Sequence, residues 1–234
     1  MGISVFSHVF RDFVSLFYPR YCFACDNYLV QGEAEICSAC LLDLPKTDFH
    51  INIRNEFYQK LEGRLPVKFV MAQLMFHKQG KVQKLLHHLK YQNRPEIGVM
   101  LGRAYGDVLA RAHYTIEFDL IVPVPLHPVR QRKRGYNQSL EFAKGLSEAL
   151  AVPFDGNLVR RVLQTETQTK RTKLKRWQNV SEVFKVVNPK PLIGKRILLV
   201  DDVMTTGSTL EACGQVILDC HCQEISFACI AAAH

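Results

Sequence analysis

Residues 196–210, which read RILLVDDVMTTGSTL, constrain the fold of this chain more than any other stretch. The apolar run Ile197–Val200 predicts a buried strand. Asp201 and Asp202 follow it directly, and a small-residue loop at 205–209 then opens a helix-like pattern. In open parallel sheets, ligands bind outside the carboxyl ends of the strands. The stretch therefore predicts a strand, an acid pair and a loop at the binding edge of such a sheet.

The loop after the acid pair consists of Thr205, Thr206, Gly207, Ser208 and Thr209. Its backbone N–H groups, its hydroxyls and the positive end of the following helix all suit a phosphate. The two carboxylates can bind sugar hydroxyls, directly or through a metal, so the combination predicts a phosphorylated ribose as ligand. Helix capping by Asp and Thr is the plainer alternative. Capping explains one or two of these residues but not the acid pair together with the whole loop.

Strand and helix patterns alternate through residues 67–234. Strands are predicted at 67–76, 119–124, 196–200 and 225–230. Helices are predicted at 82–89, 97–112, 139–150 and 208–218, the third with Ser139 as its N-cap. Residues 44–66 read as an irregular connector. The alternation is typical of an α/β domain with a mainly parallel sheet.

Composition fits a soluble globular protein, with 47% hydrophobic and 22% charged residues among 234. This length allows one well-cored domain with a small appendage. We expect the appendage at 1–55, as an amphipathic helix plus a cysteine segment, and the main domain at 56–234. The net charge of +8 favours anionic partners, such as nucleotides, pyrophosphate or nucleic acid, without choosing among them.

Residues 3–18 are apolar at helical spacing but include three charged or titratable side chains. They read as a helix packed on the protein, with binding to a membrane surface as the alternative. No stretch is long and apolar enough to span a bilayer, and no export signal is present. We therefore expect no stable membrane insertion and a reducing, cytoplasmic location.

Two Cys-x-x-Cys pairs lie near the start of the chain, separated by eleven residues; they are Cys22, Cys25, Cys37 and Cys40. Two such turns can converge on a tetrahedral site of four thiolates, which Zn²⁺ prefers. Disulfides are disfavoured in a reducing cell, whereas an iron–sulfur cluster also accepts four thiolates. A structural zinc site is the prediction, because four protein ligands leave no position open for chemistry.

A basic, proline-rich stretch at 122–138 follows another predicted strand. It carries the cations Arg130, Arg132, Lys133 and Arg134, then Gly135 and two amides. Guanidinium groups bind pyrophosphate bidentately, so this loop could hold a pyrophosphate group. A solvated basic loop is the alternative for any single arginine. The position at the end of a second strand favours binding for the stretch as a whole.

A second basic stretch at 160–180 has seven basic residues against one acid. It reads as a candidate lid that would exclude water and add charge on closing. It is also the best candidate patch for single-stranded nucleic acid, since cations surround an aromatic side chain that can stack on bases. The residues of that patch are Lys170, Arg171, Lys173, Arg176 and Trp177. A basic surface helix remains the alternative.

These motifs carry a family resemblance. Leu198–Thr209 resembles the phosphoribosyl pyrophosphate (PRPP) motif of type I phosphoribosyltransferases. Nearly the whole chain resembles the ComF family, bacterial proteins linked to DNA uptake in natural competence. The family-like segments are the cysteine pairs, Leu89-Lys90-Tyr91, Val122–Pro128, Arg134–Gln138, Thr165-x-x-Gln168, Arg176-x-x-Asn179-Val180 and the PRPP motif. The chain departs from the family at Tyr136, where Phe is common, and at 169–171, where its lid is more cationic.

The resemblance implies a type I phosphoribosyltransferase fold with an amino-terminal zinc ribbon, and a PRPP site that uses Mg²⁺. Asp201 and Asp202 would hold the ribose hydroxyls and the metal, and residues 205–209 the 5-phosphate. The pyrophosphate would be held by Leu126, His127, Arg132, Arg134 and Lys90.

Two functions follow from the resemblance. One is transfer of ribose 5-phosphate to an acceptor that the sequence does not identify. The other is a non-catalytic role in DNA uptake, with single-stranded DNA or competence proteins as partners and PRPP as a regulatory ligand. The sequence leaves open whether the chain is an enzyme.

Overall fold

The computed structural model describes residues 19–162 and 183–234. The helix predicted at 3–18 lies outside the described residues, as do Lys170, Arg171, Lys173, Arg176 and Trp177 of the basic patch.

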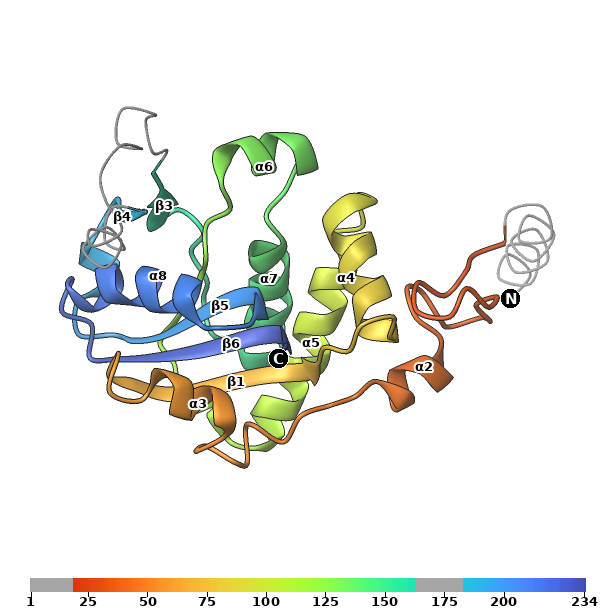
Figure 1. The fold of residues 1–234 in the computed structure, drawn as a ribbon, viewed down its shortest axis with the longest axis horizontal. Coiled ribbons are helices and arrows are strands. Elements are labelled where there is room, and N and C mark those ends of the chain that lie inside the picture. The colour runs from red at the N-terminus through yellow and green to blue at the C-terminus, as the bar shows by residue number, and fades with distance from the viewer. Residues whose placement is uncertain (1–18, 163–182) are drawn as a thin grey trace, which may run out of the picture.

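A four-stranded parallel sheet with the order β1-β6-β5-β2 forms the centre of the molecule (Figure 1). Its strands are β1 (Val67–Met75), β2 (Leu120–Pro123), β5 (Arg196–Met204) and β6 (Glu224–Ala232). A separate antiparallel pair joins β3 (Val159–Arg161) to β4 (Phe184–Val186). The predicted α/β domain with a mainly parallel sheet is confirmed.

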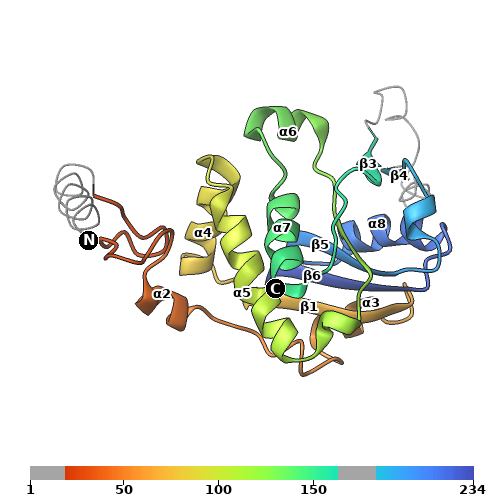
Figure 2. The same cartoon turned by 180° about the vertical axis from the view of Figure 1, so that it is seen from behind.

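The described residues form seven α-helices. They are α2 (Ser38–Asp43), α3 (Glu56–Leu61), α4 (Lys81–Tyr91), α5 (Glu96–Arg111), α6 (Pro128–Arg134), α7 (Gln138–Leu150) and α8 (Ser208–Leu218), with short 3-10 turns at Tyr114–Ile116 and Lys190–Leu192. Helices α4, α5 and α7 lie on one face, seen from behind in Figure 2, and α3 and α8 lie on the other.

The side chains of Ile197–Val200 show why this part of β5 is an unbroken apolar run. Leu198 and Val200 enter the core on the α5–α7 face, whereas Ile197 and Leu199 enter the core on the α8 face. Successive side chains of a strand point to opposite faces, so a strand buried on both sides reads as one continuous apolar run.

Helices α5 and α7 cross at very short range because glycines face each other. A Cβ at Gly145 would lie 2.1 Å from the carbonyl oxygen of Val99, and one at Gly102 would lie 2.3 Å from that of Phe142. No real side chain fits there. This close approach fixes α7 against the sheet, and with it the polar residues at the start of α7.

Two segments predicted as loops, the basic stretch after β2 and the connector at 44–66, each contain a short helix, so these predictions are wrong in part. The basic stretch after β2 contains the short helix α6, since Pro128 occupies its first turn, His127 caps the amide of Val129 and Gly135 closes it at φ 83°. The connector at 44–66 contains α3, which Asn55 caps.

The segment that carries cysteines 22–40 packs against α4. Cys22, Cys40 and Leu44 are buried in the same apolar core as Leu85 and Leu89 of α4. Figure 1 shows this segment beside α4 at one side of the molecule. None of the helices within 19–162 and 183–234 is long and apolar enough to cross a membrane.

Candidate functional site

The acid pair lies within β5, close to its carboxyl end, rather than after the strand, and both residues are partly buried. Asp201 Oδ1 accepts hydrogen bonds from the Ser139 hydroxyl and from the Asp202 amide, each at 2.9 Å. Burial, and then the nearby charge of Asp202, raise the pKa of Asp201 to about 7. Asp201 is therefore poised to change protonation state near neutral pH.

Lys90, the penultimate residue of α4, neutralises the second acid. Its Nζ lies 3.0 Å from Asp202 Oδ2, and the two side chains are 21% and 18% exposed. An ion pair so shielded from water is stronger than a surface pair. Lys90 thus links the helix layer to the acid pair.

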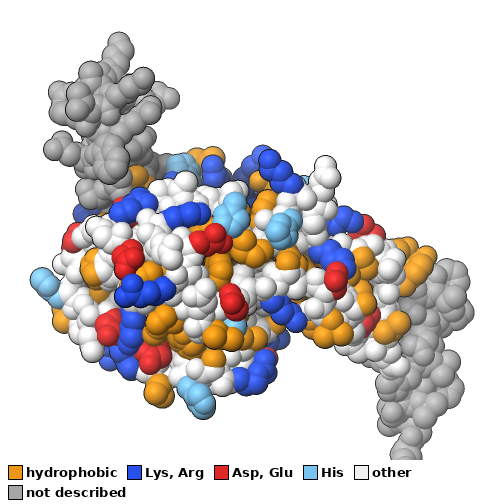
Figure 3. Space-filling view, turned by 60° about the horizontal axis from the view of Figure 1, so that its bottom comes forward, with side chains coloured by type: hydrophobic (Ala, Val, Ile, Leu, Met, Phe, Trp, Pro, Cys, Tyr) orange, Lys and Arg blue, Asp and Glu red, His pale blue; other side chains and the backbone are white. Residues whose placement is uncertain are grey.

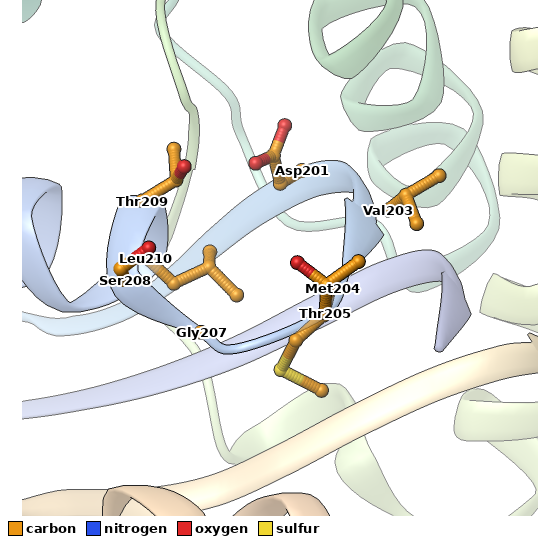
Figure 4. A pocket seen from close by; sticks show the side chains of 8 residues that line it. All are labelled: Asp201, Val203, Met204, Thr205, Gly207, Ser208, Thr209 and Leu210. Atoms are coloured by element: carbon orange, nitrogen blue, oxygen red, sulfur yellow. The ribbon is translucent and has the colours of Figure 1, made fainter. Parts of the chain in front are cut away.

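The loop between β5 and α8 offers polar groups to a ligand. Within the described residues, no protein acceptor is found for the amides of Thr206, Gly207 or Thr209, and the Thr206 and Ser208 hydroxyls lie 3.0 Å apart. Gly207 adopts φ 78°, and a Cβ there would meet Leu61 of α3 at 3.0 Å. This position therefore requires glycine. Figure 4 shows Asp201 and Thr209 around the small cavity that the loop lines.

A larger cavity, of about 170 Å³, joins the acids to the basic segment. Its charged lining consists of Lys90, Arg130, Arg134, Arg161, Asp201 and Asp202. Leu126 and Thr209 also line it, so the loop at 205–209, the acid pair and α6 meet in one place. Such an arrangement can bind a ligand that carries anionic groups at both ends.

Some of the residues predicted to bind pyrophosphate line the cavity, and others do not. Arg134 lines the cavity and donates from Nη1 to Gln138 Oε1 at 2.8 Å, whereas Arg132 is exposed and lies outside the lining. His127 is occupied at the start of α6, where its Nδ1 accepts the amide of Val129 at 3.3 Å. The structure does not bring Arg132 or His127 to the acid pair.

The sequence placed Arg130 in the basic stretch but assigned no ligand contact to three other lining residues: Gln138, Ser139 and Arg161. Ser139 was expected as a helix cap, but Asn137 caps α7 by accepting the Ser139 amide, which leaves the Ser139 hydroxyl for Asp201. The asparagine just before the predicted helix was the available signal. Gln138 Nε2 is buried and has no partner within the described residues, so it can donate to a ligand.

A second basic cavity, of about 370 Å³, opens beside the first. It is lined by Lys90, Tyr91, Asn93, Arg130, Lys133 and Arg134, with no carboxylate among the described residues that line it. Three of these cations belong to both cavities. Positive charge therefore accumulates on one side of the acid pair.

The four predicted cysteine ligands lie together. All four sulfur atoms are within 4.8 Å of one another, and Cys25 Sγ lies 3.8 Å from Cys37 Sγ. Tetrahedral Zn–S bonds of about 2.3 Å place sulfurs at about that separation. The amides of Ala24 and Cys37 donate to Cys22 Sγ at 3.4 and 3.3 Å. The cluster fits a structural metal such as zinc.

The thiols in this cluster differ in acidity. Burial opposes ionisation of Cys22, yet the amide hydrogen bonds, first that of Cys37, lower its pKa to about 7. Burial and the neighbouring thiols raise the pKa of Cys40 to about 12. Thiolates this close repel one another, and a bound divalent cation would remove that conflict.

Known protein families agree with this geometry. The phosphoribosyl transferase domain model matches residues 136–234, which run from the start of α7 to the end of the chain. With the parallel sheet and its flanking helices, this match identifies the fold as that of the type I phosphoribosyltransferases.

Relatives extend the match over nearly the whole chain. Competence protein F of Haemophilus influenzae is 31% identical over 218 residues, which cover 89% of this chain and 95% of the relative. The chain belongs to the ComF family. DNA utilization protein YhgH of Escherichia coli is 30% identical over 86% of this chain and 91% of its own length. Competence protein ComFC of Bacillus subtilis is 25% identical over 86% of this chain and 78% of its own length.

Among solved structures, the ComF chain is similar to the glutamine PRPP amidotransferase of Bacillus subtilis complexed with ADP and GMP. The two share 20% identity with a TM-score of 0.44 over 62% of this chain. The match covers only 30% of that longer enzyme.

Proposed function

We propose that this protein binds PRPP with Mg²⁺ and transfers its ribose 5-phosphate to an acceptor, with release of pyrophosphate. One observation carries the proposal: Asp201 and Asp202 lie in a cavity between an amide-rich loop and a basic helix. A molecule with a phosphate at one end, a ribose in the middle and a pyrophosphate at the other end complements that order of groups.

Each part of the site has a proposed role. Residues 205–209 bind the 5-phosphate through amides and hydroxyls. Asp201 and Asp202 bind the ribose hydroxyls and would hold Mg²⁺, whose charge neutralises the pyrophosphate. Lys90, Arg130 and Arg134 bind the pyrophosphate, and Leu126 shapes the wall beside it. Gln138 Nε2 donates to the same group.

In the proposed reaction, the bond between C1 of the ribose and the pyrophosphate oxygen breaks, and the oxygen keeps both electrons. A bond forms between C1 and the nucleophile, which then loses its proton. Positive charge develops on the ribose while negative charge grows on the leaving group. The cations of α4 and α6 stabilise the leaving group because they are fixed in place before the reaction begins.

Calorimetric titration with PRPP and Mg²⁺ tests the ligand. The double variant Asp201→Asn/Asp202→Asn should bind at least about a hundredfold more weakly, since it loses two charge-assisted contacts. The exposed acid Asp107 provides the control variant Asp107→Asn. Equal affinity in wild type and double variant would remove the assignment. Pyrophosphate release with a panel of bases and amines then tests catalysis.

A second candidate function is supported by the chain's charge and by the names of its relatives. The net charge is +8, and relatives carry the names competence protein and DNA utilization protein. In this alternative the protein binds single-stranded DNA or competence proteins, and PRPP acts as a regulatory ligand. Neutralising Lys170, Arg171 and Lys173 should then weaken DNA binding and flatten its salt dependence by about two to three units of log–log slope.

We further propose that the cysteine cluster holds Zn²⁺ and that residues 1–55 are an appendage on a phosphoribosyltransferase-like domain of residues 56–234. Metal analysis distinguishes zinc from an iron–sulfur cluster, since only the cluster colours the protein. The division is tested by expressing residues 56–234 alone and measuring whether they unfold cooperatively.

A further inference from the structure

The cysteine module, defined here as residues 22–44, contacts one face of α4. Asp43 pairs with Lys81, and Asp26 pairs with Lys84, each at 2.6 Å between Nζ and a carboxylate oxygen. The ring of Phe23 lies 4.8 Å from the ring of His88. Positions 81, 84 and 88 follow one another along a single face of a helix, so the module contacts α4 from its first residue to His88.

Helix α4 depends on this contact because its own first turn is poorly stabilised. The helix begins at Gly80 without a side-chain cap, and its first turn has no acidic residue. Lysines at 81 and 84 lie near the positive end of the helix dipole, where cations are unfavourable. The carboxylates of Asp26 and Asp43 supply the missing negative charge from the module.

A bound metal would strengthen the same contact. Four thiolates around one divalent ion leave a net charge of about −2 on the cluster. That charge attracts the ammonium groups of Lys81 and Lys84, which the ion pairs with Asp43 and Asp26 hold against the module. The module is also too short to keep its shape on a core of its own, so its surface depends on the metal.

The far end of α4 enters the PRPP site. Lys90 pairs with Asp202 at 3.0 Å, and the carbonyl of Leu89 accepts a hydrogen bond from the Tyr136 hydroxyl. Arg94, just beyond α4, places its guanidinium 5.1 Å from the ring of Phe23 in the module. The end of the helix is therefore held both by the module and by the segment that leads into α7.

We infer that the cysteine module, filled with metal, is a positioning element for the PRPP site, which acts by fixing α4 so that Lys90 reaches the acid pair and the pyrophosphate. This inference rests on the proposed function, because it assigns Lys90 to PRPP. It gives the cysteines a role at a site to which they contribute no ligand.

A double variant, Asp26→Ala/Asp43→Ala, tests the inference while keeping all four cysteines. PRPP affinity should fall about three- to tenfold, since two exposed ion pairs are lost and only part of their effect reaches the site. The conservative variant Asp26→Glu/Asp43→Glu should restore it. Metal content should stay unchanged in every case.

The matched control is Glu117→Ala/Glu224→Ala, which removes the two carboxylates that pair with Lys68 at 2.8 and 2.9 Å, away from α4. This control should change PRPP affinity less than twofold. A loss equal to that of the module variant would show a general effect of stability and would overturn the inference.

A double-mutant cycle with Lys90→Ala separates positioning from other effects. In the Lys90→Ala background, the module variant should cause no further loss of affinity, because the residue it positions is gone. The same fold-loss in both backgrounds would mean that the module acts independently of Lys90, contrary to the inference.

Amide hydrogen exchange distinguishes failure of this inference from failure of the proposed function. If wild type binds no PRPP, the proposed function fails, yet exchange at the end of α4 still reports on positioning. The module variant should exchange faster at Leu89–Tyr91 than wild type. Unchanged exchange there would overturn the inference whatever the ligand is.

Discussion

In the free protein, the position of Asp201 is unfavourable for its ionised carboxylate. Its side chain lines the cavity, and burial, with the nearby charge of Asp202, raises its pKa to about 7. An unfolded aspartate ionises near pH 3.9. Between these values the folded state binds more protons than the unfolded state, so the stability contributed by this group falls as pH rises from about 4 to about 7.

We expect Asp201→Asn to stabilise the free protein at pH 8. The amide oxygen can still accept from Ser139, while the charge beside Asp202 is removed. The free energy of unfolding should rise by about 1–2 kcal/mol at pH 8, after allowance for partial solvation, and by about a third as much at pH 5. Urea unfolding at both pH values measures this. A gain of the same size at pH 5 would contradict the explanation.

Two neighbouring arginines provide a comparison within one short helix. Arg130 lines both basic cavities, whereas Arg132 lines neither. Arg130→Ala should weaken binding of pyrophosphate about tenfold or more, because a charge-assisted hydrogen bond contributes about 1.5–3 kcal/mol. Arg132→Ala should stay within twofold. Calorimetric titration with pyrophosphate and Mg²⁺ measures both affinities. A larger loss for Arg132→Ala than for Arg130→Ala would favour Arg132, the residue predicted from the sequence.

Asn137, Gln138 and Ser139 reach the site from the start of α7. Their position depends on the close packing of α7 against α5, which glycines allow. We expect Gly145→Ala to destabilise the protein by about 3 kcal/mol or more, because the new Cβ would overlap a backbone carbonyl of α5. Gly80→Ala is the control, since the nearest atom to its Cβ lies at 3.2 Å. It should change stability by less than about 1 kcal/mol. Thermal unfolding of both variants provides the measurement.

Long elements were predictable because their patterns are local. The strand at β1, the helix at α5 and the strand–helix pair at β5 and α8 lie within a few residues of their predicted bounds. Helix α3 was missed because it has only six residues and part of its cap is tertiary: Asn55 also donates to the Val70 carbonyl of β1, at 2.8 Å. A sequence window does not contain that partner.

The same reasoning explains which site residues were missed. Once α6 is a helix, positions 130, 133 and 134 share one side and 132 faces elsewhere. If the stretch is taken as a loop, no helical periodicity assigns its side chains to one side. The sequence therefore could not show that Arg130 faces the cavity and Arg132 does not. Ser139 and Arg161 reach the acids only through the packing of α7 and the β3–β4 pair, which sequence does not specify.

The molecule as a whole combines a charged site with a balanced exterior. Figure 3 shows acidic and basic side chains interspersed around apolar ones on one face of the molecule. By contrast, Lys90, Arg130, Lys133 and Arg134 gather beside a single cavity. Positive charge at that cavity favours the approach of an anionic ligand.

Metal removal should affect the whole molecule because the cysteine segment shares the core of α4 and α5. We expect about one zinc per chain, and a loss of at least about 5 °C in Tm for Cys22→Ser/Cys40→Ser, since structural zinc contributes directly to folding. Cys220→Ser, outside the cluster, is the control. Unchanged Tm on loss of the metal would contradict a structural role.

The order of strands in the sheet has a consequence for how the protein is made. Strand β1 pairs with β6, and β6 is the last of the four strands to leave the ribosome. About 150 residues separate the two strands, so the edge of β1 that pairs with β6 stays open while those residues are synthesised. Until the last strand of the sheet is made, this open edge can mispair with other segments.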